Sequence, residues 1–208
     1  MSTIGRDAEV AEIIHNCLYM NKFYDRLASK INGKAYCSLK RSKHSEYDAK
    51  IVLPTNELLF REKAQIKFIN NPVASFTLEV FDTSRNKDGW LFTDNFDLNY
   101  VFIWVLNSVS RYETIQSYAE INKIRLCICQ NGVLRGFAPS DIKESIDLIQ
   151  KQKLPKLLLS NDLLLIRSTK YTEVPINIKV PFDLLVKNSK LCVDFDCKTS
   201  TFSTVKSW

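Results

Sequence analysis

The segment Tyr100–Leu106, with the sequence YVFIWVL, is an uninterrupted apolar run. Its short length and its β-branched and aromatic residues predict a strand, and the lack of polar alternation predicts that both faces of this strand are buried. A strand of this kind lies inside a sheet that is covered on both sides. This run therefore constrains the fold more than any other segment of the chain.

Helical and strand-like segments alternate along the 208 residues. Apolar residues recur at helical spacing between Asp7 and about Asn32, and again between Ser140 and Lys151. We expect an α/β fold with a central mixed β-sheet flanked by helices. A hydrophobic content of 45% is typical of a globular protein, and the length suits a single domain over residues 1–208. We expect a core at about residues 7–130 and a C-terminal extension at about residues 131–208.

Two further local patterns give specific predictions. Residues Arg111–Asn122 are expected to form a helix. The Asn131-Gly132 pair is typical of a tight hairpin turn, and we expect it to lead into a strand at Val133–Phe137.

Polar residues interrupt the strand-like stretch between Tyr47 and Trp90. They are Asp48, Gln65, Lys67 and Glu79. Side chains two apart on a strand share a face, so Gln65 and Lys67 in AQIKFI would point the same way. A carboxylate on one strand and a Gln-x-Lys pair on the next can then converge on one divalent cation and one water.

This arrangement resembles the core of the PD-(D/E)XK nuclease superfamily, which includes restriction enzymes and many phage and repair nucleases. The matching elements are a long helix, Asp48 in EYDAKI, and Gln65 with Lys67 in AQIKF. The later run TLEVFDTSRNKDGWLF, followed by DLNYVFIWV, is similar to phage or mobile-element members. The chain differs from most members in having Gln65 in place of a carboxylate, and no Pro precedes Asp48.

The resemblance implies a restriction-endonuclease-like core and a Mg²⁺ site, with Mn²⁺ as a substitute. Mg²⁺ prefers oxygen ligands, and a bound cation lowers the pKa of an attacking water. The predicted ligands of the cation are Asp48, the amide oxygen of Gln65 and the backbone carbonyl of Ile66. Lys67 would orient the attacking water. Glu79 would supply further negative charge for binding the metal. An alternative alignment makes Glu79 the motif carboxylate, but position 81 is then Phe.

Each of these residues also has a simple structural interpretation. Asp48 can pair with Lys50 or Lys67 on a solvated face, and Gln65 with Lys67 can form the exposed side of an amphipathic strand. Glu79 can bond to a neighbouring hydroxyl or backbone group.

Two basic segments, residues 40–43 and the loop at residues 83–89, are candidate phosphate contacts. The net charge of +6 permits a polyanionic partner without requiring one. We expect DNA as the partner, and the sequence leaves a homodimer open. The candidate nucleic-acid contacts are Lys40, Arg41, Lys43, Arg85 and Lys87.

Other classes of site find little support in the sequence. The six cysteines form no Cys-x-x-Cys pairs, which argues against structural zinc. Neither His15 nor His44 has a recognisable Cys or Ser partner, so a hydrolase triad is not predicted. There is no membrane-spanning run or leader-like N-terminus, and with unpatterned cysteines we expect a cytoplasmic setting.

The sequence thus predicts a metal-dependent endonuclease or phosphodiesterase that hydrolyses DNA phosphodiester bonds. The alternative is a catalytically inactive nuclease-fold protein that binds nucleic acid or a protein partner. A third interpretation is a phage or mobile-element protein with a structural or inhibitory role and an unrelated fold.

Overall fold

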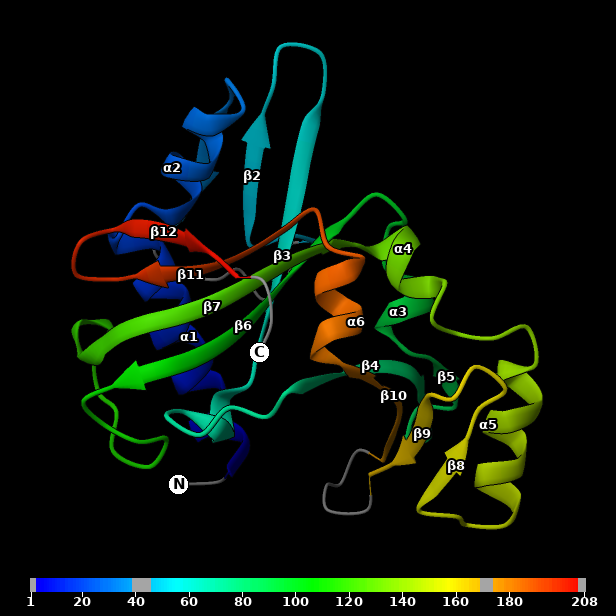
Figure 1. The fold of residues 1–208 in the computed structure, drawn as a ribbon. Coiled ribbons are helices and arrows are strands. Elements are labelled where there is room, and N and C mark those ends of the chain that lie inside the picture. The colour runs from blue at the N-terminus through cyan, green and yellow to red at the C-terminus, as the bar shows by residue number, and fades with distance from the viewer. Residues whose placement is uncertain (1–2, 39–45, 169–173, 206–208) are drawn as a thin grey trace.

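The computed structural model describes residues 3–38, 46–168 and 174–205. Two sheets and several helices form the molecule (Figure 1). The helices are α1 (Thr3–Met20), α2 (Phe23–Lys30), α3 (Trp90–Thr93), α4 (Asn131–Arg135), α5 (Ile142–Lys151) and α6 (Phe182–Lys187), with 3-10 helices η1 (Ile66–Phe68) and η2 (Tyr118–Glu120).

The first sheet has seven strands in the order β1-β2-β3-β6-β7-β11-β12. Strands β3 and β6 run parallel, and the other neighbours run antiparallel. These strands are β1 (Lys34–Cys37), β2 (Ala49–Val52), β3 (Glu57–Ala64), β6 (Asn99–Ser108), β7 (Ile121–Gln130), β11 (Leu191–Asp196) and β12 (Thr201–Thr204).

The second sheet has five antiparallel strands in the order β5-β4-β10-β9-β8. It is built by the crossover between β3 and β6 together with the segment that precedes β11. Its strands are β4 (Ser75–Asp82), β5 (Lys87–Asp88), β8 (Lys156–Leu158), β9 (Leu164–Arg167) and β10 (Pro175–Pro181).

Strand β6 separates two hydrophobic cores. Val101 and Ile103 pack with α1 and α2, whereas Phe102 and Trp104 pack with residues of the second sheet. The Phe102 ring lies 4.6 Å from that of Phe76 on β4. This confirms that the apolar run forms a strand buried on both faces, and with it the α/β fold with a mixed sheet flanked by helices.

The N-terminal helical region is divided in two. Lys22 adopts a left-handed conformation with φ of 56°, and this separates α1 from α2. Both helices pack on the same face of the first sheet, and in Figure 1 α1 passes behind β6 and β7 while α2 lies beside β2. The break lets α2 turn onto β1 and β2, which positions its side chains beside the β2–β3 hairpin.

Two local predictions are wrong, and one holds. Where we expect a helix, residues 112–114 form a turn and Tyr118–Glu120 a 3-10 helix, and Ile121 already begins β7, which pairs with β6. Asn131 and Gly132 open α4 and form no hairpin turn. The predicted helix at Ser140–Lys151 is confirmed as α5, with Ile142, Ile146 and Ile149 buried.

Candidate functional site

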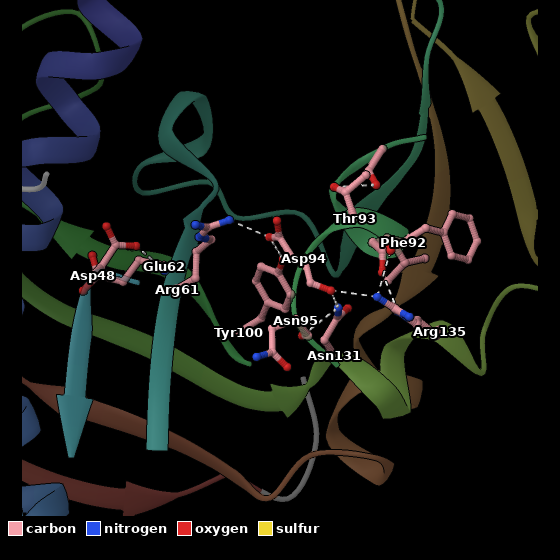
Figure 2. A network of polar contacts seen from close by, with 12 residues as sticks. Asp48, Arg61, Glu62, Phe92, Thr93, Asp94, Asn95, Tyr100, Asn131 and Arg135 are labelled. Carbon is pink, nitrogen blue, oxygen red and sulfur yellow. Dashed lines mark hydrogen bonds and ion pairs between the residues drawn. The ribbon is translucent and has the colours of Figure 1, made fainter. Parts of the chain in front are cut away.

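Asp48 lies directly before β2, beside the middle of β3. Its Oδ2 accepts a hydrogen bond from the backbone N–H of Glu62 at 2.8 Å. Its own N–H donates to the carbonyl of Phe60 at 2.7 Å. The structure therefore brings Asp48 to Glu62, a residue that the sequence analysis did not single out (Figure 2).

Glu62 is a charged residue on a buried face. Phe60 and Glu62 share the face of β3 that α1 and α2 cover, and Glu62 is 5% exposed. Both of its carboxylate oxygens lie 3.0 Å from Nδ1 of His15, and the Tyr24 hydroxyl donates to Oε1 at 2.9 Å. Three elements of the chain, α1, α2 and β3, thus meet at this carboxylate. Such burial is tolerated because the charge is paired and hydrogen-bonded.

His15 is fully buried on α1. Burial by itself lowers the pKa of His15, but hydrogen bonds to Cys37 and Glu62, the negative charge of Glu62 and the Ser38 carbonyl together raise it to about 11. The imidazole is therefore an imidazolium at neutral pH. Burial, and then the charge of Glu62, raises the pKa of Tyr24, so its hydroxyl remains a neutral donor.

A cavity of about 730 Å³ opens beside this cluster. Tyr24, Cys37, Ser38 and Asp48 belong to its lining, so groups in contact with the buried ion pair also face the cavity. Its volume is in the range of pockets that hold small ligands. The remaining lining residues are Leu18, Tyr19, Met20, Lys22, Asp25, Ala35, Tyr36 and Tyr47.

Tyr36 stands at the margin of this cavity on the edge strand β1. Its side chain is 48% exposed, and the ammonium groups of Lys34 and Lys50 lie 5.3 Å and 5.9 Å from its ring centre. Ala35 and Cys37 pack toward α1 and α2, so Lys34 and Tyr36 point to the opposite face of β1. The result is an exposed aromatic ring with two ammonium groups close to it, and Lys50 also forms an ion pair with Glu57 at 3.2 Å.

Gln65 and Lys67 are not brought to Asp48. Gln65 follows the end of β3, three residues beyond Glu62, which is roughly 10 Å at the rise of a strand. Its amide Nε2 donates to the Val73 carbonyl at 3.1 Å and its Oε1 accepts the Val73 N–H at 3.0 Å. Lys67 lies on η1 and forms an ion pair with Asp7 at 3.2 Å. The expected Gln-x-Lys strand face is absent because η1 turns the chain there.

The other predicted residues are also spread over the molecule. Ile66 lies on η1 against the helix-side core. Glu79 lies on β4 of the second sheet, and Arg85 and Lys87 lie at the β4–β5 turn, where Arg85 pairs with Asp82 at 3.5 Å. The candidate contacts Lys40, Arg41 and Lys43 lie outside the described residues.

The residues present do not fit the magnesium site that the nuclease resemblance implies. The Gln65 oxygen already accepts a backbone hydrogen bond, and the carboxylate of Glu62 is bonded to an imidazolium. Lys63, the residue after Glu62, points to the opposite face, where its Nζ lies 4.5 Å from the Trp90 ring centre. Across residues 3–38, 46–168 and 174–205, no group of three or more His, Cys, Asp or Glu side chains is placed to hold a metal ion.

A second polar network occupies that opposite face of β3. Arg61 pairs with Asp94 at 2.6 Å, and the Tyr100 hydroxyl donates to the same carboxylate (Figure 2). Burial, and then the hydrogen bond to Asp94, raises the pKa of Tyr100. Arg135 and Asn131 on α4 bond to backbone carbonyls around Asp94. This network fixes the segment between α3 and β6.

The sequence around Glu62 indicates a buried carboxylate, although the nuclease-like motif points to Asp48, Gln65 and Lys67 instead. Leu58 and Phe60 are two residues apart in a strand-like stretch, so the period of two places Glu62 on the same face as these apolar residues. A carboxylate at such a position needs a partner. His15 is the corresponding polar residue among the apolar positions of α1, and Cys37 becomes its neighbour because β1 returns beside that helix.

Comparison with protein-family models, with curated proteins and with solved structures found no match for this chain. In the described part of the chain, every helix is too short or too polar to cross a lipid bilayer.

Proposed function

We propose that this protein binds nucleic acid on the open face of β1 and β2, as a nuclease-like fold that does not use the metal chemistry of nucleases. The observation that carries the proposal is Tyr36, an exposed ring with the ammonium groups of Lys34 and Lys50 close to it, of which Lys50 also pairs with Glu57 at 3.2 Å. Exposed aromatic rings stack on unpaired bases, and flanking lysines contact phosphates. The partner we expect is DNA with unpaired bases.

The order of elements supports the nuclease-like part of the proposal. A long helix, Asp48 before one strand and an acidic residue on the next strand follow the order of the resemblance. The buried ion pair of Glu62 with His15 supports the non-catalytic part, because it consumes the carboxylate that a metal would need.

The test is the binding of labelled single-stranded DNA, single-stranded RNA and duplex DNA, followed by fluorescence anisotropy between 50 and 200 mM salt, concentrations at which phosphate contacts are resolved. Tyr36→Ala should weaken binding of single-stranded DNA about tenfold, the effect of losing one stacked base. Lys34→Gln should reduce the salt slope by about 0.7, the share of one phosphate on a single strand.

Phe96→Ala is the matched control. Phe96 is also an exposed ring beside a cation, at 56% exposure and 5.6 Å from the guanidinium of Arg135, but it lies near α4. The control should bind as the wild type does. Absence of binding to all three polymers at 50 mM salt, or equal binding by Tyr36→Ala, would contradict the proposal.

Metal-dependent cleavage of DNA is the second candidate, and the contact of Asp48 with Glu62 favours it. Asp48 lines the cavity and its carboxylate accepts the backbone N–H of Glu62, so two acidic residues lie next to each other there. Supercoiled plasmid and single-stranded DNA would be incubated with Mg²⁺, with Mn²⁺ and with a chelator. Cleavage that requires a metal and is lost in Asp48→Asn would establish this candidate in place of the non-catalytic proposal.

A further inference from the structure

Two thiols that are 180 residues apart in the sequence meet in the helix-side core. Cys17 lies on α1 and Cys197 directly follows β11, and their sulfur atoms are 3.3 Å apart. Both side chains are buried in the core that α1 and α2 form with the first sheet. The side-chain amide of Asn21 also donates to the sulfur of Cys17, at 3.5 Å. The two thiols are therefore held in contact within one packed layer.

The backbone is fixed on both sides of this contact. Cys17 lies near the C-terminal end of α1, a helix of 18 residues. The N–H of Cys197 donates to the carbonyl of Asn122 on β7 at 2.8 Å. The carboxylate of Asp196 accepts two backbone N–H groups of the turn that leads into β12, at 2.9 Å and 2.8 Å. The fold itself thus brings the two sulfur atoms together, and a bond between them needs only a small adjustment of the side chains.

Three further buried cysteines, Cys127, Cys129 and Cys192, lie together in the other core. The sulfur atoms of Cys127 and Cys129 are 4.0 Å apart on one strand, and Cys192 is the partner of Cys127 on the neighbouring strand β11. A bond between Cys127 and Cys192 would connect strands that backbone hydrogen bonds already join. A bond between Cys17 and Cys197 would instead connect a helix to the last hairpin of the chain, so it would add a constraint of a new kind.

The hairpin that Cys197 begins is a weakly held part of the first sheet. Its second strand, β12, lies at the edge of that sheet, and three of its four residues are exposed. Short exposed elements near a chain end open more easily than the centre of a sheet. A covalent bond from α1 to the start of this hairpin would oppose that opening, and it would also close a long loop in the unfolded chain.

We propose that Cys17 and Cys197 form a redox-dependent disulfide that fastens the C-terminal hairpin to α1, with a small disulfide such as glutathione disulfide as the oxidant. One cysteine thiolate attacks a sulfur of glutathione disulfide, which gives a mixed disulfide and releases one glutathione thiolate. The second cysteine thiolate attacks the protein sulfur of that mixed disulfide, and a second glutathione thiolate leaves. The two departing thiolates take up the two protons that the cysteines lose. This inference is independent of nucleic-acid binding.

The test oxidises the reduced full chain with glutathione disulfide by two routes. One portion is incubated in native buffer, and the other is unfolded in denaturant and returned to native buffer that contains the same reagent. Free thiols are then blocked, and linked peptides are identified by mass spectrometry without reduction. The main intramolecular disulfide should be Cys17–Cys197 by both routes, more slowly by the native route because buried thiols are shielded. Cys197→Ser should not form this link.

Thermal unfolding gives a second readout. The oxidised chain should unfold at a temperature at least about 5 °C above that of the reduced chain, because the link restricts the unfolded state, and a reducing agent should remove the shift. Cys127→Ser is the matched control, since it replaces a buried thiol of the other core. It should form the same disulfide and show the same shift, whereas Cys197→Ser should show none.

Three results would each overturn the proposal. The first is another intramolecular pair, such as Cys127–Cys192, as the main product. The second is the lack of a Cys17–Cys197 disulfide by either route. The third is an unfolding temperature of the oxidised chain that equals or lies below that of the reduced chain. If the denatured chain does not refold, the native route decides alone.

Discussion

Two neighbouring residues of β3, Arg61 and Glu62, begin two different polar networks on opposite faces of one sheet (Figure 2). On the far face, Arg135 and Asn131 donate to main-chain carbonyls near Asp94. Those bonds hold a loop in place. On the helix face, side chains bond to one another, and Tyr24 of this network lines the 730 Å³ cavity. Arg61 and Asp94 of the far-face network line a separate cavity of about 410 Å³.

The difference separates a network in which most donors are used on backbone carbonyls from one that is built mainly of bonds between side chains. Donors that are used on backbone carbonyls have little capacity left for a ligand, and their loss changes only stability. The His15–Glu62 pair also stabilises the fold, but it leaves Cys37 and Asp48 at the wall of the cavity. Substitutions in the two networks should therefore lower the unfolding free energy by different amounts and with a different dependence on pH.

The largest effect is expected from Glu62→Ala. Removing this carboxylate leaves the imidazolium of His15 buried without its partner, which typically costs about 3–5 kcal/mol of unfolding free energy. Chemical denaturation at pH 7 measures the loss. A loss below about 1 kcal/mol would show that the ion pair is not formed.

A smaller loss is expected from Arg135→Ala in the opposite network. Its guanidinium bonds to the carbonyls of Leu91, Phe92 and Asp94, and hydrogen bonds to charged groups contribute about 1.5–3 kcal/mol. The same denaturation experiment should give that loss at both pH 6 and pH 9. A loss that varies with pH would mean that the two networks are coupled.

The pH dependence of the unfolding free energy of the wild type should reflect the protonation of His15. Its pKa is raised from 6.5 to about 11, so its stabilising contribution is complete below about pH 6.5 and declines as pH rises toward 11. Between pH 6 and pH 9 the unfolding free energy should fall by roughly 1–3 kcal/mol from this group. His15→Gln should remove most of that slope. A wild-type slope that persists in His15→Gln would assign the dependence to other groups.

The smallest effect is expected from Arg61→Ala, since its ion pair with Asp94 is partly exposed. Exposed pairs contribute about 0–1 kcal/mol. A loss as large as that of Glu62→Ala would contradict the distinction between the two faces.

The sequence was sufficient for the strand in the centre of the fold and for the α/β class, because Tyr100–Leu106 has no polar position. It was not sufficient for the register of the β2–β3 hairpin. Ala49 pairs with Phe60 and Val52 with Glu57, so a tight turn at residues 53–56 places Asp48 opposite the middle of β3. A longer turn would have placed it opposite Gln65.

The other residues of the site could not be predicted because they meet through contacts between segments that are far apart in the sequence. Asp48 was identified from its motif, and the structure places it at the cavity, whereas His15 and Cys37 meet only because α1 and β1 pack together. Nothing in the spacing of those two residues encodes the contact. The left-handed turn at Lys22, which directs α2 onto the hairpin, occurs at a residue without a turn signal.

The most direct test of nucleic-acid binding at Tyr36 is the affinity of single-stranded DNA for the wild type, Tyr36→Ala and Phe96→Ala, each titrated over a range of salt concentrations. We expect salt-sensitive binding by the wild type and Phe96→Ala, and about tenfold weaker binding by Tyr36→Ala. Equal affinities for all three proteins, or no binding at low salt, would contradict the proposal.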